Sequence, residues 1–200
     1  MVIGLILAAG ASTRMGRTKA LLPIGADTFV VHLARAFIAA GIDDVVVVTG
    51  PERDAIASAL ADARIPARVV ENPRREDGQL SSLHVGLAVS DKPGVEAVVV
   101  GLVDVPLTSA RTIGAVLEAF RRTHAPIVRP AVRGRHGHPV LFARAVFDQL
   151  RRADPGSGAK AVVRAHDQDL VNVPVDDEGA CTDIDTPADY ARLICSASST

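Results

Sequence analysis

Short apolar runs alternate along the chain with longer stretches in which apolar residues recur every three to four positions. Runs rich in Val and Ile predict buried strands, and the longer stretches predict helices that pack on them. The predicted strands are 2–7, 44–48, 68–70, 97–102, 127–129, 139–142 and 170–173. The predicted helices are 29–40, 53–63, 80–90, 109–122, 143–151, 159–165 and 187–194.

The order of these elements predicts an α/β fold. Runs 45–48 and 98–100 are apolar on both faces, which is typical of central strands covered by helices on both sides. Strands that alternate with helices indicate parallel strands joined by crossover helices, so we expect a three-layer, doubly wound, Rossmann-like fold with a mostly parallel sheet. No repeat or long linker interrupts the chain, and residues 1–195 are expected to form a single domain followed by a disordered tail, 196–200.

Composition and charge narrow the set of partners. The 200 residues include 48% hydrophobic and 22% charged residues, with a formal net charge of −1. Such a chain lacks the excess of Lys and Arg that nucleic acid or an anionic membrane requires, so neither is an expected partner. Cys181 and Cys195 show no metal-ligand or disulfide spacing. No apolar run approaches the roughly 20 residues that cross a bilayer, and the apolar start has no basic segment before it, so we expect a cytoplasmic protein.

The loop directly after the first predicted strand has the composition of a phosphate-binding loop. It reads L-A-A-G-A-S-T-R-M-G-R-T-K from Leu7 to Lys19, and no acidic residue occurs between positions 5 and 26. Small residues let backbone N–H groups approach a phosphate, while Arg14 and Lys19 supply positive charge. The spacing is not that of a Walker A loop, and Ser12 replaces the second glycine of the dinucleotide fingerprint. The alternative is a glycine-rich turn with exposed cations and no ligand.

A carboxylate follows the predicted strand 97–102, where ligands bind in a doubly wound sheet. Asp104 stands in the segment V-D-V-P, and Pro106 stops further strand pairing. Mg²⁺ favours one or two carboxylates together with phosphate oxygens, so Asp104 is a candidate metal ligand. The alternative is a turn residue before the helix that begins near position 109.

Two further carboxylates precede the last predicted helix, in the segment T-D-I-D-T-P. Thr186 is expected to cap this helix and Pro187 to occupy its first position. In an extended segment Asp183 and Asp185 would point to one side, and two such carboxylates repel each other unless a cation lies nearby. A helix start explains the Thr-Pro pair but not the two acids.

Two polar segments remain. Gly78, Ser81 and Ser82 lie in a loop that runs into a helix, where they could contact a nucleobase or simply begin the helix. Positions 119–147 contain no acidic residue but many cations, and the G-R-H-G-H-P centre predicts a loop before a strand. Such a cationic region implies a second anionic ligand. A zinc site is disfavoured because the His-x-His pair has no third ligand at a suitable spacing. The candidate contacts for this second ligand are Arg133, Arg135, His136 and His138.

The string L-A-A-G-x-S-x-R-M-G-x-x-K resembles the signature of the nucleotidyltransferases that mature the molybdenum cofactor, and D-x-P, G-x-x-S-S-L and D-I-D-T-P-x-D-Y follow in that family's order. The resemblance implies that Arg14 and Lys19 bind phosphates, that Asp104 holds the catalytic metal, and that Asp183, with Asp185 second, gives another metal contact. It also implies that the nucleotide binds along the loop after the first strand and the loop that contains Gly78, against Leu7, Ala8, Ala9, Gly10, Gly78, Ser81 and Ser82. The second substrate, which accepts the transferred group, would bind near the cationic segment and Asp185.

The resemblance implies an Mg²⁺-dependent transfer of CMP from CTP to molybdopterin or its molybdenum-loaded form, with release of pyrophosphate. Ala9, in place of a second glycine, favours the cytidylyl branch over the guanylyl branch. A molybdenum enzyme or its chaperone would be a transient partner. Three alternatives remain: transfer to a sugar or alditol phosphate, a catalytically silent nucleotide- or cofactor-binding maturation protein, and a nicotinamide-dependent reductase, whose fingerprint the chain lacks.

Overall fold

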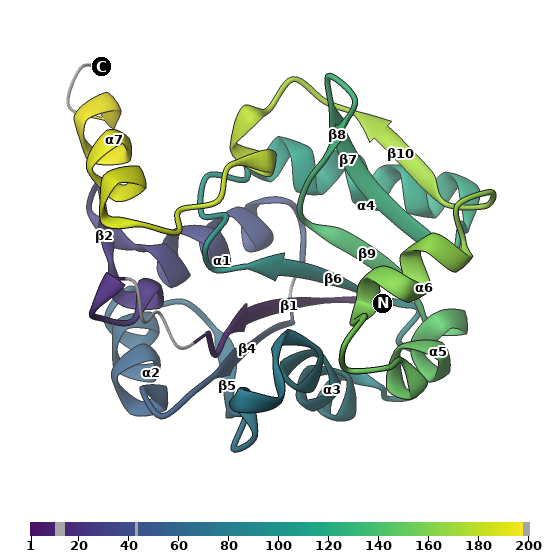
Figure 1. Ribbon diagram of the computed structural model, residues 1–200, viewed down its shortest axis with the longest axis horizontal. Helices are drawn as coiled ribbons and strands as arrows, with labels where there is room; N and C mark the ends of the chain where they lie inside the picture. The colour runs from purple at the N-terminus through teal and green to yellow at the C-terminus, as the bar shows by residue number, and fades with distance from the viewer. Residues whose placement is uncertain (11–14, 43, 198–200) are drawn as a thin grey trace.

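A computed structural model describes residues 1–10, 15–42 and 44–197 and shows a central sheet between two layers of helices (Figure 1). The eight-stranded sheet has the order β10-β7-β9-β6-β1-β4-β5, with β8 paired to β7. The predicted α/β fold with a mostly parallel sheet is therefore confirmed. The strands are β1 Val2–Ala8, β4 Val45–Thr49, β5 Ala67–Glu71, β6 Ala97–Leu102, β7 Ile127–Val132, β8 Arg135–His136, β9 Val140–Ala143 and β10 Val171–Pro174, and β2 Pro23–Ile24 and β3 Asp27–Thr28 form a separate small sheet.

Helices cover both faces of the sheet, as the apolar strands predict. On one face α1, α2 and α4 share a hydrophobic cluster with Ile6 and Ala8 of β1. On the other face α3, α5 and α6 share a second cluster with Leu5 and Leu7 of the same strand. The helices are α1 Phe29–Ala39, α2 Arg53–Asp62, α3 Gln79–Ser90, α4 Ala110–Thr123, α5 Phe147–Arg152, α6 Ala159–Ala165 and α7 Pro187–Ala197.

Close packing of α3 on β1 depends on Gly86. A Cβ atom built at Gly86 would lie 2.4 Å from Cδ1 of Leu5, which is too close for a real contact. The bare backbone at this position lets the helix approach the strand directly. The first turn of α3 is thereby held beside the carboxyl end of β1, where the predicted phosphate loop begins.

The direction of β9 is the main departure from a parallel sheet. This strand lies between β6 and β7 and is antiparallel to both, with Val100 opposite Val140 and Ile127 opposite Phe142. A strand that runs the other way brings its first residues, not its last, to the carboxyl ends of the parallel strands. The segment that precedes Val140 consequently lies beside the turn that follows β6.

Most predicted elements begin or end at a different residue in the structure, and two of these differences have a clear cause in the sheet. The helix expected over 143–151 begins later, because Ala143 still belongs to the sheet and donates its backbone N–H to Pro126 O, and a 3₁₀ turn, Arg144–Val146, precedes α5. The strand expected over 127–129 continues to Val132 although Pro130 has no N–H to donate. Its pairing with β9 has ended at Val128, and β10 and β8 pair with the later residues.

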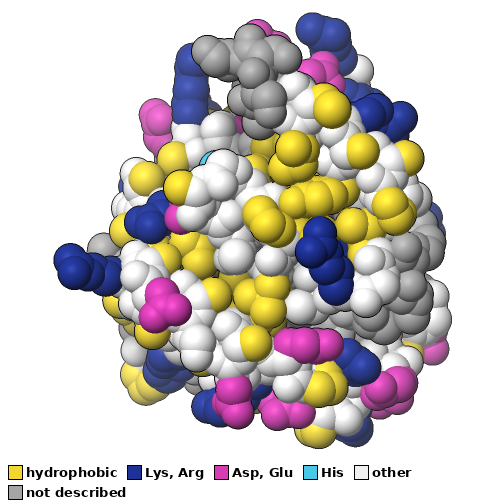
Figure 2. All heavy atoms as spheres, turned by 90° about the vertical axis from the view of Figure 1, so that its left-hand side faces the viewer, with side chains coloured by type: hydrophobic (Ala, Val, Ile, Leu, Met, Phe, Trp, Pro, Cys, Tyr) yellow, Lys and Arg dark blue, Asp and Glu magenta, His cyan; other side chains and the backbone are white. Residues whose placement is uncertain are grey.

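The last helix, α7, lies at one side of the molecule near β2 (Figure 1). The hydroxyl of Tyr190 donates to Pro23 O at 2.9 Å, and its ring meets Phe29 edge-on. Figure 2 shows this side, where hydrophobic side chains are visible between charged ones. Because α7 ends at Ala197, residues 196 and 197 of the expected disordered tail are helical, and 198–200 lie outside the described residues. No helix in the described part of the chain is long and apolar enough to span a membrane.

Candidate active site

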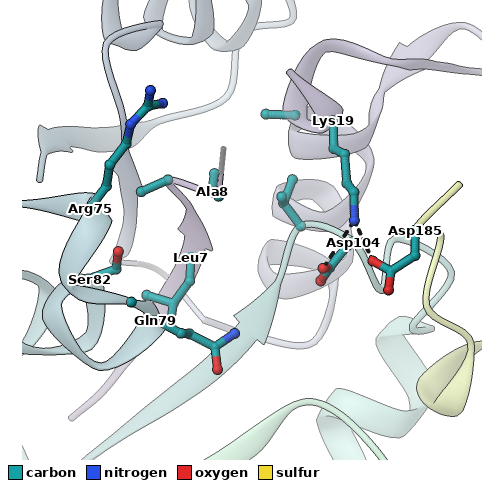
Figure 3. A pocket seen from close by; sticks show the side chains of 13 residues that line it. Leu7, Ala8, Lys19, Arg75, Gln79, Ser82, Asp104 and Asp185 are labelled. Carbon is teal, nitrogen blue, oxygen red and sulfur yellow. Dashed lines mark hydrogen bonds and ion pairs between the residues drawn. The ribbon is translucent and has the colours of Figure 1, made fainter. Parts of the chain in front are cut away.

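A cavity of about 350 Å³ opens where β1 and β6 end and α3 begins. Figure 3 shows Lys19 pointing toward Asp104 and Asp185 on one side, with Arg75, Gln79 and Ser82 on the other. This first cavity brings together most of the predicted nucleotide-binding positions, which come from two distant segments, with two of the predicted carboxylates. Its lining includes Leu7, Ala8, Ala9, Gly10, Lys19, Gly78, Ser82, Asp104 and Asp185.

Lys19 bridges two of the predicted carboxylates. It begins a 3₁₀ turn, Lys19–Leu21, and only 9% of the residue is exposed. Its Nζ lies 2.6 Å from Oδ1 of Asp185 and 3.4 Å from Oδ2 of Asp104. A buried ammonium between two carboxylates offsets their mutual repulsion, so this is the cation that the acidic segments require.

A tight turn after β6 holds Asp104 and connects it to the closing segment, residues 182–187. The backbone N–H of Val103 donates to Leu7 O at 3.1 Å, and that of Val105 donates to Leu102 O at 3.0 Å. The N–H of Ile184 donates to Asp104 O at 2.7 Å. These bonds fix the predicted metal ligand against the segment that carries the other two acids.

Asp183 and Asp185 flank the buried Ile184 and both line cavity walls, although residues 183–185 form no strand. Partial burial raises the pKa of Asp183, and the like charges of Asp104 and Asp185 raise it further, while Lys19 opposes the shift. The part of this shift in pKa that comes from the two neighbouring acids indicates excess negative charge, which a bound cation would relieve.

The start of α7 fixes the position of Asp185. As predicted, Thr186 caps the helix, its Oγ1 accepting from the N–H of Asp189 at 3.2 Å, and Pro187 is the first helical residue. The carboxylate of Asp189 accepts in return from Thr186 Oγ1, from Thr186 N and from Asp185 N. Hydrogen bonds from Thr186 lower the pKa of Asp189 to about 2, so the capping carboxylate stays ionised.

The two predicted serines have different surroundings. Ser82 lines the first cavity and accepts from Asn72 Nδ2 at 3.0 Å. Ser81 does not line it: its hydroxyl lies 2.8 Å from Gly78 O and 2.9 Å from Arg74 O, and it accepts from Asn72 at 2.7 Å. Ser81 therefore shapes the loop that presents Gly78, whose φ is 89°, to the cavity.

Arg75 and Gln79 also line the first cavity, and neither was predicted. Both lie in the polar middle segment, but the family pattern drew attention to Gly78 and the serines only. The guanidinium of Arg75 is 3.3 Å from Glu76 and 3.9 Å from Glu52. It supplies a cation on the side of the cavity opposite Lys19 (Figure 3). Arg14, the other predicted phosphate contact, lies outside the described residues.

A second cavity, of about 560 Å³, adjoins the first. The two share Leu7, Gln79, Asp104 and Asp185. Asp183 and His138 line the second cavity, and so does a segment that the sequence did not single out, residues 155–160.

The rest of the predicted acceptor cluster does not line either cavity. Arg133 and Arg135 lie in the hairpin that β7 and β8 form, and both pair with Glu178, which is far from the hairpin in sequence. The acid-free stretch is therefore not an unopposed cationic region. His136 is exposed on β8. Burial lowers the pKa of His138 to about 4, so this side chain is neutral at pH 7 and contributes no positive charge.

Comparison with known proteins agrees with this geometry. A family model described as a MobA-like NTP transferase domain matches residues 4–170. A nicotine blue oxidoreductase of Paenarthrobacter nicotinovorans is 31% identical, covering 96% of each chain. A probable molybdenum cofactor guanylyltransferase of Mycolicibacterium paratuberculosis is 26% identical over 95% of this chain and 93% of the relative. The crystal structure of Rv0371c from Mycobacterium tuberculosis is 30% identical, with a TM-score of 0.80 and 96% of each chain covered. The structure of Rv0371c in complex with manganese is 28% identical, with a TM-score of 0.78 and 98% of each chain covered.

Proposed function

Since the chain belongs to the MobA-like NTP transferase family and is a nucleotidyltransferase, we propose that it transfers CMP from CTP to molybdopterin or its molybdenum-loaded form and releases pyrophosphate. The observation that carries the proposal is the contact of Lys19 with both Asp104 and Asp185 at the mouth shared by two cavities. Two cavities that meet at a cluster of charged groups suit a reaction between two anionic substrates.

The residues present fit a divalent metal that takes most of its ligands from substrate. Within the described ranges, no group of three or more His, Cys, Asp or Glu side chains could hold an ion by itself. Mg²⁺ commonly binds through one or two carboxylates and substrate phosphates, and Asp104 and Asp183 are the proposed carboxylates. When bound, the ion would neutralise phosphate charge. The manganese complex of Rv0371c supports a divalent metal in this fold.

The chemistry that these residues serve is an in-line displacement. An oxygen of the acceptor's phosphate attacks the α-phosphorus, the α–β phosphoanhydride bond breaks, and pyrophosphate leaves with the bonding electrons. Lys19, and by family resemblance Arg14, would stabilise the leaving group, and Arg75 would face the phosphates from the other side. No covalent intermediate on the protein is required, because positioning and charge neutralisation supply the catalysis.

The nucleobase is the finer part of the proposal. Ala9 is buried and lines the first cavity, and a methyl group there in place of a second glycine would leave less room for a base, which supports the smaller pyrimidine. The name of the mycobacterial guanylyltransferase argues for GTP instead. We would offer CTP, GTP and ATP at equal concentration with Mg²⁺ and molybdopterin and measure pyrophosphate release. A clear preference for GTP or ATP would overturn the cytidylyl assignment.

The same assay separates the other candidate functions. Pyrophosphate release with a sugar or alditol phosphate, and not with molybdopterin, would identify that phosphate as the acceptor. No pyrophosphate release with any acceptor would favour a catalytically silent maturation protein. The relative named as an oxidoreductase makes a reductase the second candidate. Oxidation of NADPH, measured as a loss of its absorbance, would support the reductase. A cytoplasmic location, and transient contact with a molybdenum enzyme or its chaperone, are further parts of the proposal.

A further inference from the structure

The second cavity has an apolar floor. Strands β6 and β9 contribute Val100, Val140 and Phe142, and α3 and α6 contribute Leu83 and Val163. These side chains give a ring system an apolar surface to pack on beside the polar groups of the cavity, and about 560 Å³ lies within the usual size range of roughly 300–1,000 Å³ for ligand cavities. The floor is therefore suited to the ring portion of an acceptor.

The charged side chains of this cavity are arranged asymmetrically. Asp104 and Asp185 line both cavities, and Asp183 lines the second one only. Of the described residues that line it, Lys160 is the only Lys or Arg. Lys160 is exposed and makes no ion pair with any other described residue, whereas Arg133 and Arg135 of the hairpin pair with Glu178. The cation available to an anion in the second cavity is Lys160.

The segment before Lys160 has a defined shape. The carboxylate of Asp154 accepts from the backbone N–H of Gly156 at 2.9 Å and of Ser157 at 3.2 Å. The N–H of Gly158 donates to Asp154 O at 2.9 Å, and the φ of Gly158 is 59°. The loop thus forms a wall of small residues around the cavity and leads into α6 with Lys160 at its second position.

We propose that the second cavity is the acceptor site, that its apolar floor holds the ring system of the acceptor, and that Lys160 holds its phosphate-bearing, anionic form. Arg133 and Arg135 pair with Glu178 in the 3₁₀ turn Glu178–Cys181 and do not contact the acceptor. This inference rests on the proposed transfer to a molybdopterin-like compound, and it moves acceptor recognition from the hairpin to the loop before α6.

Binding of a fluorescent pterin pair tests the inference without any turnover. The probes are 6-hydroxymethylpterin phosphate and 6-hydroxymethylpterin, which differ by the phosphate. Lys160→Gln should weaken binding of the phosphate about tenfold and leave the uncharged probe unchanged. Arg135→Gln and Arg164→Gln are matched controls: Arg164 is exposed on the same helix and does not line the cavity. Ala159→Phe places a bulky ring in the second cavity, and it should weaken the binding of both probes while CTP binding persists.

Three outcomes would overturn the inference: equal binding of the phosphate probe by wild type and Lys160→Gln, equal losses for the two probes in that variant, or a larger loss in Arg135→Gln. In turnover, Lys160→Gln should raise the KM for molybdopterin about tenfold, and kcat should fall as well, because the phosphate that Lys160 holds is also the attacking group and changes its charge in the transition state. If no transfer to molybdopterin occurs but the probe results hold, the proposed function fails and the anion site stands. If transfer occurs and Lys160→Gln changes neither probe binding nor KM, the inference alone fails.

Discussion

Replacing Lys19 by methionine removes one charge and keeps most of the side-chain volume. The lysine side chain is only 11% exposed, and its Nζ contacts Asp185 at 2.6 Å and Asp104 at 3.4 Å. In the proposed reaction the same ammonium neutralises charge that grows on the leaving pyrophosphate. Loss of one such preorganised group costs about 10²- to 10³-fold in kcat. We therefore expect Lys19→Met to lose turnover by about this factor.

The same substitution should have the opposite effect on metal binding without nucleotide. In the free protein Lys19 occupies the space between carboxylates that a divalent ion would share. An ammonium about 5 Å from a divalent ion repels it by roughly 1.7 kcal/mol at the permittivity of water, which corresponds to somewhat more than tenfold in affinity. Lys19→Met should accordingly bind Mn²⁺ about tenfold more tightly than the wild type.

Calorimetric titration with Mn²⁺ and a pyrophosphate-release assay measure the two effects separately. Lys92→Met is a suitable control, because Lys92 is exposed and lines neither cavity. Unchanged kcat in Lys19→Met would refute its role at the phosphates. Reduced kcat with unchanged Mn²⁺ affinity would refute the idea that Lys19 competes with the metal for the carboxylates.

Two more predictions concern carboxylates. Asp104→Asn should abolish pyrophosphate release in Mg²⁺ with an unchanged circular dichroism spectrum, since the amide keeps the shape of the side chain and loses the anionic ligand. Asp183→Asn should lower pyrophosphate release less. Full wild-type activity in excess EDTA would contradict both expectations. Burial acts to raise the pKa of Asp177, but hydrogen bonds from Thr112 and Ser109 outweigh it and leave the pKa lowered. Stability from a lowered pKa is complete above the unfolded-state pKa and is lost as pH falls through the folded-state pKa. The advantage in Tm of wild type over Asp177→Asn should therefore shrink below about pH 4, and a difference independent of pH would be evidence against this explanation.

The fold could be predicted from the sequence because its core strands are apolar on both faces. Strand β6 has the predicted bounds, 97–102, because its apolar run is short, rich in valine and bounded by Glu96 on one side and by Asp104 and Pro106 on the other. The antiparallel direction of β9 was not predictable in the same way. Periodicity shows that a strand exists, but its direction depends on which neighbours it pairs with.

The candidate site could be predicted in part, for a related reason. Lys19, Asp104 and Asp185 stand in recognisable motifs, and the structure brings them into contact. The pairing of Arg133 and Arg135 with Glu178 was missed, because a charge count over a contiguous stretch ignores acids that the fold brings from elsewhere. Lys160 was missed because its loop matches no motif and its significance depends on the cavity beside it.

Because β9 runs antiparallel to its neighbours, the residues that distinguish the two cavities lie in different parts of the amino-acid sequence. Every described residue that lines the first cavity precedes Pro106, apart from Asp185. The second cavity takes its distinctive wall, including His138, Val140 and residues 155–160, from the later half of the chain. A chimera that exchanges the segment after β6 for that of a family member should consequently inherit the acceptor of the donor while it keeps the nucleotide of the recipient.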